Sequence, residues 1–124
     1  MATPREQFSH FASILPVHDM QRSIGFYRDQ LGFSVEFEWE NPPSYVVLRR
    51  GEVSIHLSLR EDLEEIPGAL IYIFVHDVDE VLKAYLACGG AVMEAIGDRD
   101  YQMRDFDIRD PDGHRITIGM GLEQ

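Results

Sequence analysis

The sequence predicts an α+β fold made of two successive β-α-β-β-β units. The first observation behind this prediction is an internal repeat, because Val-His-Asp at 17–19 recurs at 75–77, an offset of 58 residues that also relates Tyr27 to Tyr85. The second observation is the spacing of the apolar residues. It changes from the spacing of a strand to that of a helix and back to that of a strand, and this order occurs twice along the chain.

The length of 124 residues favours one domain, 1–124, large enough to bury a hydrophobic core. The first unit is expected at about 8–60 and the second at about 69–121. Residues 61–68, "EDLEEIPG", are acidic and end in Pro-Gly, which is typical of a linker.

The first unit opens with the short apolar run "FASILPV", residues 11–17, which suits a strand. Asp19 is a good N-cap because its carboxylate can accept a hydrogen bond from an unpaired backbone N–H. Apolar residues then recur at helical spacing from Met20 to Leu31. Gly32 can adopt the left-handed conformation that ends a helix.

The rest of the first unit reads as three strands. Apolar and acidic residues alternate over 33–40, "FSVEFEWE", which is the strand period. The segment 41–44, "NPPS", interrupts the chain. Residues 45–60, "YVVLRRGEVSIHLSLR", then predict a hairpin that turns at Gly51.

The second unit repeats this order. The run 69–75, "ALIYIFV", predicts a strand, and Asp77 with Glu80 forms a pair typical of a capping box at a helix start. Gly89 and Gly90 end that helix. Three further strands are expected, and a "DPDG" turn precedes the last of them; their ranges are 91–96, 104–110 and 115–120.

The net charge of −11 argues against a nucleic-acid partner and against an anionic membrane surface, since both require clustered Lys and Arg. No apolar run reaches the roughly 18 residues of a membrane helix. The N-terminus lacks the apolar stretch of a signal peptide, and the lone Cys88 allows no internal disulfide. A cytoplasmic location is therefore expected.

Two segments, "VHDMQRSIGFYRDQLGF" and "RDPDGHRITI", within two β-α-β-β-β units, resemble the glyoxalase, bleomycin-resistance and extradiol-dioxygenase superfamily. The resemblance covers nearly the whole chain. It implies curved mixed sheets around a cavity, and a homodimer in which units are paired within a chain or swapped between chains.

The resemblance also implies where a metal would be bound. The four family ligand positions fall on Ala12, His56, Leu70 and Thr117, of which only His56 can coordinate. A divalent cation generally needs at least three protein ligands, so no metal or cofactor is expected. An atypical site that uses His10 and His56 remains an alternative.

Strand alternation predicts which side chains face the cavity. His56 should face it, as should Tyr72 and Phe74, whereas Val35 and Phe37 should enter the core. The predicted ligand-binding residues are His56, Glu38, Trp39, Tyr72, Phe74, Tyr101 and Arg104. Glu36 accompanies Glu38 in this prediction, and a twist or bulge near Trp39 could turn its ring toward a ligand.

Each of these predicted binding residues also has a simpler interpretation. His56 could be a hydrogen-bonded cavity histidine with no catalytic role, and Tyr72 and Phe74 could pack at a dimer interface. Glu36 and Glu38 could form a solvated strand face. Arg104 could pair with one of its acidic neighbours.

The expected function is metal-independent binding of a small molecule, in the manner of bleomycin-resistance proteins, which sequester a bulky aromatic cation. Aromatic faces and acidic residues suit such a ligand. No catalytic residue is assigned. One alternative is a metal-dependent lyase, isomerase or dioxygenase with an unusual site, and another is a regulatory or structural dimer with a vestigial cavity.

Overall fold

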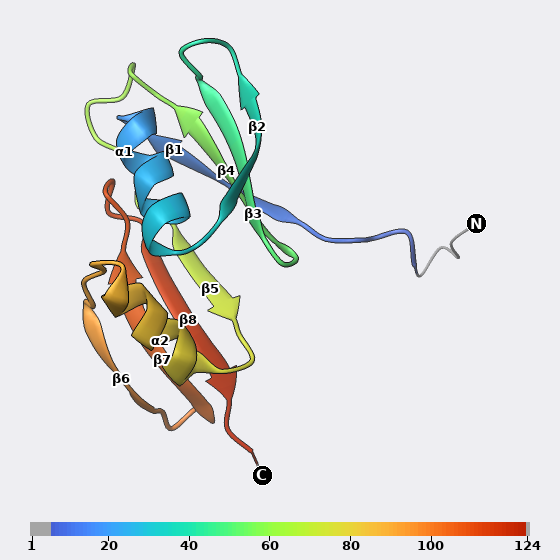
Figure 1. Cartoon of the computed structure of the whole chain (residues 1–124), viewed down its shortest axis with the longest axis vertical. Coiled ribbons are helices and arrows are strands. Elements are labelled where there is room, and N and C mark those ends of the chain that lie inside the picture. The colour runs from blue at the N-terminus through green and yellow to red at the C-terminus, as the bar shows by residue number, and fades with distance from the viewer. Residues whose placement is uncertain (1–5, 124) are drawn as a thin grey trace.

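The computed structural model describes residues 6–123 and contains two four-stranded sheets, each with helix packed on one face (Figure 1). The elements of the first unit are β1 (Ala12–Val17), α1 (Met20–Gly25), η2 (Phe26–Gln30), β2 (Ser34–Trp39), β3 (Tyr45–Arg50) and β4 (Val53–Leu59). Those of the second unit are β5 (Leu70–Phe74), α2 (Val78–Ala87), β6 (Glu94–Asp98), β7 (Met103–Arg109) and β8 (Arg115–Gly121).

The two sheets have the same topology. The strand orders are β1-β4-β3-β2 and β5-β8-β7-β6, with the first strand of each unit parallel to the last and the other pairs antiparallel. The register is also the same, because Ala12 pairs with Ser54 as Leu70 pairs with Arg115. The predicted α+β fold of two β-α-β-β-β units is confirmed.

The repeated Val-His-Asp motif starts a helix in both units. The Asp19 carboxylate accepts a hydrogen bond from the Arg22 N–H, and the Asp77 carboxylate accepts one from the Glu80 N–H. The last part of the first predicted helix, Phe26–Gln30, is not a regular α-helix. There η2 is a π-helical turn, in which the Leu31 N–H bonds the Phe26 carbonyl five residues back.

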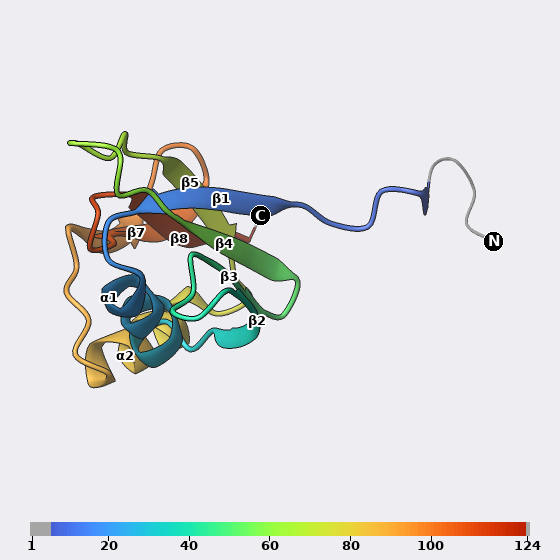
Figure 2. The same cartoon turned by 90° about the horizontal axis from the view of Figure 1, so that it is seen from above.

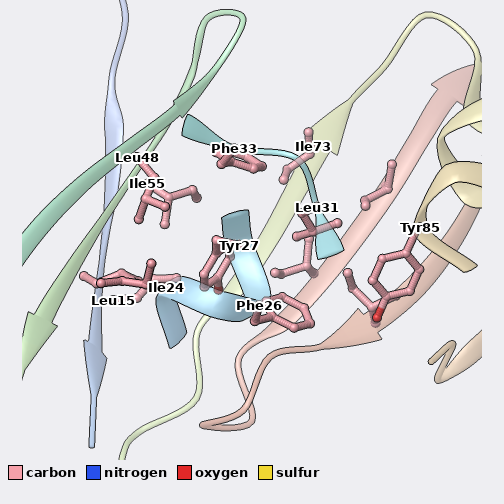
Figure 3. Close-up of a cluster of buried hydrophobic side chains, with 14 of the residues drawn as sticks. Leu15, Ile24, Phe26, Tyr27, Leu31, Phe33, Leu48, Ile55, Ile73 and Tyr85 are labelled. Carbon is pink, nitrogen blue, oxygen red and sulfur yellow. The ribbon is translucent and has the colours of Figure 1, made fainter. Parts of the chain in front are cut away.

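One hydrophobic core serves both units. The helices lie on the same side of the two sheets (Figure 2), and the Phe26 ring of the first unit meets the Tyr85 ring of the second at 6.5 Å. Figure 3 shows Tyr27 and Leu31 of the first unit in one buried cluster with Ile73 and Tyr85 of the second. Because the core lies on the helix side, each sheet turns its other face outward.

We call these outward sheet faces the open faces. The open face of the first unit carries Ile14, Phe37, Trp39, Tyr45, Val47 and His56. The open face of the second carries Leu70, Tyr72, Phe74, Asp105, Asp107 and Thr117.

A buried polar network joins the two units on the helix side. The Tyr27 hydroxyl donates to Oδ2 of Asp110 over 2.7 Å, and the Asp112 carboxylate accepts from the Ser23 hydroxyl and the His18 N–H. The "DPDG" turn of the second unit therefore holds the first helix of the other unit.

His114 extends this network in a fully buried position. Its Nδ1 accepts from the Ala69 N–H at 2.9 Å, so the ring proton is on Nε2, which donates to the Pro16 carbonyl at 2.8 Å. His114 thus bridges the starts of β5 and β8 to the end of β1. The two motifs that carry the family resemblance have a structural role, because they fasten the units together.

Candidate ligand-binding site

His56 lies at the centre of the open face of the first unit. It is half-buried and alternates with the core residues Ile55 and Leu57 along β4, as the sequence predicts. Its Nδ1 lies 2.7 Å from the hydroxyl of Tyr45, whose ring meets the imidazole edge-on. Tyr45 sits diagonally across the β3–β4 pair, which is within reach of a long side chain. The strand patterns of the sequence did not predict Tyr45 as this partner.

A β-bulge in β2 decides which residues join His56. Val35 pairs with Leu48 but Phe37 pairs with Val47, so Glu36 is the extra residue and the alternation reverses after it. Phe37 and Trp39 therefore lie on the open face, 50% and 59% exposed, with their rings 6.5 Å apart. The expectation that Phe37 enters the core is wrong. The bulge places Trp39 on the same face as His56, and its role in ligand binding stays a prediction.

The same bulge affects the two glutamates differently. Glu36 accepts a hydrogen bond from Arg49 at 2.8 Å. Glu38 pairs with Val46, a fully buried residue of the helix-covered face. Glu38 is exposed, and it does not share a face with His56.

The open face of the second unit is aromatic and aliphatic along β5. Leu70, Tyr72 and Phe74 are exposed between the inward-facing Ile71 and Ile73. The rings of Tyr72 and Phe74 lie 4.7 Å apart. They lie on the same face, as the sequence predicts, and form an aromatic surface on β5, an edge strand of this sheet.

Beside these rings lies a polar cluster that the sequence analysis missed. Asp105 of β7 is 1% exposed, and its Oδ2 accepts hydrogen bonds from the hydroxyls of Tyr72 at 2.9 Å and Tyr101 at 2.7 Å. Arg99 donates to Oδ1 at 2.7 Å. Burial by itself would raise the pKa of Asp105, but the three hydrogen bonds outweigh it and hold the pKa below its ordinary value.

Gly119 makes the contact between Tyr72 and Asp105 possible. Tyr72 reaches from β5 across β8 to β7, and Gly119 is the β8 residue that lies in between. A Cβ at that position would come 2.7 Å from Cβ of Asp105 and still closer to the Tyr72 hydroxyl. A glycine is therefore required there for steric reasons.

Arg104 lies apart from both open faces. It pairs with Met120, which packs against the core, and its guanidinium forms ion pairs with Asp79 at 2.8 Å and Asp98 at 3.0 Å. The alternative interpretation, pairing with acidic neighbours, is therefore the one that the structure supports. Tyr101, in contrast, joins the second open face through Asp105.

The family metal positions occupy equivalent places in the two sheets. Ala12 and Leu70 share one register position, and His56 and Thr117 share another. Ala12, Leu70 and Thr117 offer a methyl, an isobutyl and a hydroxyl group, and this set with a single imidazole does not suit a divalent metal. Within residues 6–123, no group of three His, Cys, Asp or Glu side chains is placed to hold an ion.

His10 does not complete such a site. Its Nδ1 is 2.8 Å from the Ser9 hydroxyl, and its Nε2 accepts from Arg49 at 3.3 Å. Both ring nitrogens therefore already have partners within the chain.

A groove of about 1000 Å³ lies between the two units, beside the β3–β4 turn. Tyr72, Phe74 and His10 line it, together with core residues such as Phe33 and Ile73. His56, Trp39 and Tyr101 are outside its lining. This groove therefore does not gather all of the predicted binding residues.

The chain belongs to the glyoxalase/bleomycin resistance protein/dioxygenase superfamily, whose family model matches residues 7–118. It is 31% identical to a bleomycin resistance protein of Geobacillus stearothermophilus over 122 residues, covering 84% of this chain and 90% of that one. It is 30% identical over 118 residues to the uncharacterised YraH of Bacillus subtilis, with 84% and 91% coverage.

Solved structures show the same fold at lower identity. TioX from Micromonospora superposes with a TM-score of 0.81 at 19% identity, covering 93% of this chain and all of that one. A lactoylglutathione lyase from Agrobacterium tumefaciens superposes with a TM-score of 0.75 at 20% identity, with 94% and 96% coverage. Across residues 6–123, no helix is both long and apolar enough to cross a membrane.

Proposed function

We propose that the protein is a cytoplasmic homodimer that binds bulky, aromatic, positively charged small molecules without a metal, as the name of its bleomycin-resistance relatives suggests. The observation that carries this proposal is the concentration of large exposed apolar side chains on the open faces. These side chains are Ile14, Phe37, Trp39, Leu70, Tyr72, Phe74 and Tyr101. Contiguous exposed apolar surface of this kind marks a ligand or protein interaction site.

The position of the core supports the proposal of a dimer. Since both open faces point away from the shared core, the two faces of one chain do not enclose a ligand between them. A second copy can supply the missing wall if the first open face of one chain meets the second open face of the other. The binding groove is then made twice, by symmetry.

The open faces suit a flat, cationic ligand. Ring faces attract cations and stack on flat groups, and the net charge of −11 draws cations toward the protein. The His56–Tyr45 pair offers polar atoms for hydrogen bonds at the centre of the first open face.

Titration of the fluorescence of Trp39, the only tryptophan, tests this function. We expect bleomycin or ethidium to quench the emission at micromolar concentration, and we expect sedimentation equilibrium to give twice the chain mass. Phe37→Ala should weaken binding. Leu86→Ala should not, since Leu86 is equally exposed (50%) but lies on α2, away from the open faces.

The competing metalloenzyme is tested in the same preparation. Elemental analysis of protein purified without chelator is expected to find no stoichiometric Zn, Ni, Mn or Fe. One equivalent of any of these metals, or ligand binding that EDTA abolishes, would replace this proposal with the metal-dependent alternative.

A further inference from the structure

The carboxylate of Asp105 is shared by two tyrosines from different segments. Tyr72 belongs to β5 and Tyr101 to the turn between β6 and β7, yet both hydroxyls donate to the same Oδ2 atom, at 2.9 and 2.7 Å. Arg99 neutralises the carboxylate from the other side at 2.7 Å. Asp105 is 1% exposed, whereas Tyr72 and Tyr101 are 36% and 62% exposed. The carboxylate lies underneath, and the rings are open to solvent.

This arrangement restricts what the tyrosines can present to a ligand. Each phenol hydroxyl is already used in a hydrogen bond to Asp105, so the accessible part of each side chain is the ring itself. The hydroxyl end of each ring is also anchored, which limits rotation of an otherwise mobile exposed side chain. Phe74 continues the surface, 4.7 Å from Tyr72.

The charge of the cluster also matters for the kind of ligand. The ion pair with Arg99 leaves no free carboxylate oxygen for a salt bridge to a ligand. A cation can instead be attracted by the ring faces, which carry the negative part of the aromatic quadrupole. A hydroxyl that donates to a carboxylate makes its ring more electron-rich, which strengthens this attraction.

We propose that Asp105 is a positioning residue that fixes Tyr72 and Tyr101 as an aromatic wall and gives this wall its preference for flat organic cations over neutral molecules of the same shape. This inference rests on the proposed function, since it specifies how the second open face contributes to ligand binding. Asp105 acts through the two rings and does not touch the ligand.

The experiment compares Asp105→Asn with Asp107→Asn. Asp107 lies two residues further along the same face and is also buried, but it is paired with Arg115 and bonds neither tyrosine. The probes are N-methylacridinium, a flat cation, and acridone, its neutral counterpart, and binding is followed by the anisotropy of the probe. Ionisation of tyrosine is followed in parallel by absorbance at 295 nm.

The wild type is expected to bind N-methylacridinium more tightly than acridone. Asp105→Asn should weaken cation binding by about tenfold and reduce the preference. It should also shift tyrosine ionisation to lower pH, because the hydrogen bond to Asp105 raises the pKa of Tyr101, and burial together with Asp105 raises that of Tyr72. Asp107→Asn should change the preference and the ionisation of tyrosine less than Asp105→Asn does, because Asp107 acts on both tyrosines through its charge and makes no hydrogen bond to either.

Three results would overturn the inference: unchanged binding in Asp105→Asn, an equal effect in Asp107→Asn, or no preference for the cation in the wild type. If both probes bind but one of these three results is found, the inference is wrong and the proposed function is unaffected. If neither probe binds, the inference and the proposed function are both refuted. If Asp105→Asn does not fold, the double variant Tyr72→Phe/Tyr101→Phe keeps the rings and removes only their anchors. It is expected to show the same loss of preference.

Discussion

The two tyrosines of the internal repeat allow a sharp test of the network that joins the units. Tyr27 and Tyr85 occupy equivalent helix positions and are 0% and 2% exposed. The Tyr27 hydroxyl donates to the buried carboxylate of Asp110 at 2.7 Å, across the two units. The Tyr85 hydroxyl donates to the carbonyl of Ala91 at 2.9 Å and accepts from the N–H of the same residue at 3.2 Å, both within its own unit. Substitution of each tyrosine by phenylalanine removes one hydroxyl from the same kind of site.

The expected losses of stability differ because the acceptors differ. Tyr27→Phe leaves a 5%-exposed carboxylate without one of its donors, and hydrogen bonds to charged groups contribute about 1.5–3 kcal/mol. Tyr85→Phe removes two bonds to the neutral backbone groups of Ala91, but Ala91 is exposed and these groups can bond water instead, so we expect a total loss of about 0.5–1.5 kcal/mol. For a chain of 124 residues, 1 kcal/mol corresponds to about 4 °C in Tm. We therefore expect Tyr27→Phe to lower Tm by about 6–12 °C and Tyr85→Phe by about 2–6 °C.

Urea unfolding followed by circular dichroism measures both free energies, at one protein concentration because a dimer makes the midpoint concentration-dependent. A double-mutant cycle with Asp110→Asn isolates the coupling between Tyr27 and Asp110. Equal losses for the two tyrosines, or a coupling near zero, would show that the network does not hold the units together as described.

Further predictions concern the second open face. Gly119→Ala should lower stability by about 1–3 kcal/mol in urea unfolding, because the new Cβ overlaps Tyr72 and Asp105, whereas Gly121→Ala, with no atom within 4 Å, should be neutral. The lowered pKa of Asp105 means that its stabilising effect is present above its ordinary value of 3.8 and is lost as pH falls through the lowered pKa. The urea midpoint of Asp105→Asn should therefore vary less with pH in the acid range than that of the wild type. Burial and Asp105 raise the pKa of Tyr72 above 10.0, so this contribution is present below pH 10 and is lost at higher pH. Alkaline unfolding monitored at 295 nm checks this, and Tyr72→Phe should remove that part of the pH dependence.

Much of the fold could be predicted because it depends on short-range patterns. An N-cap needs one side chain next to a helix start, and a strand or helix needs only a periodic run of apolar residues. Asp19, Asp77 and the alternation along β4 and β5 were therefore correctly placed. The internal repeat then predicted that the second unit copies the first.

The candidate site was predicted only in part, for a physical reason. The bulge at Glu36 reversed the faces of Phe37 and Glu38, and a bulge arises from a mismatch in length between two partner strands that neither strand shows alone.

What the sequence by itself determined was the type and order of the elements, since each is encoded by its own residues. Only the tertiary structure decided which side chains meet across elements. Tyr72 and Asp105 are 33 positions apart, and Tyr27 and Asp110 are 83 apart. Such partners are set by strand register and by the packing of both helices into one core, and these depend on the whole chain at once. The same packing turns both open faces outward, where we propose that a second copy and a ligand bind.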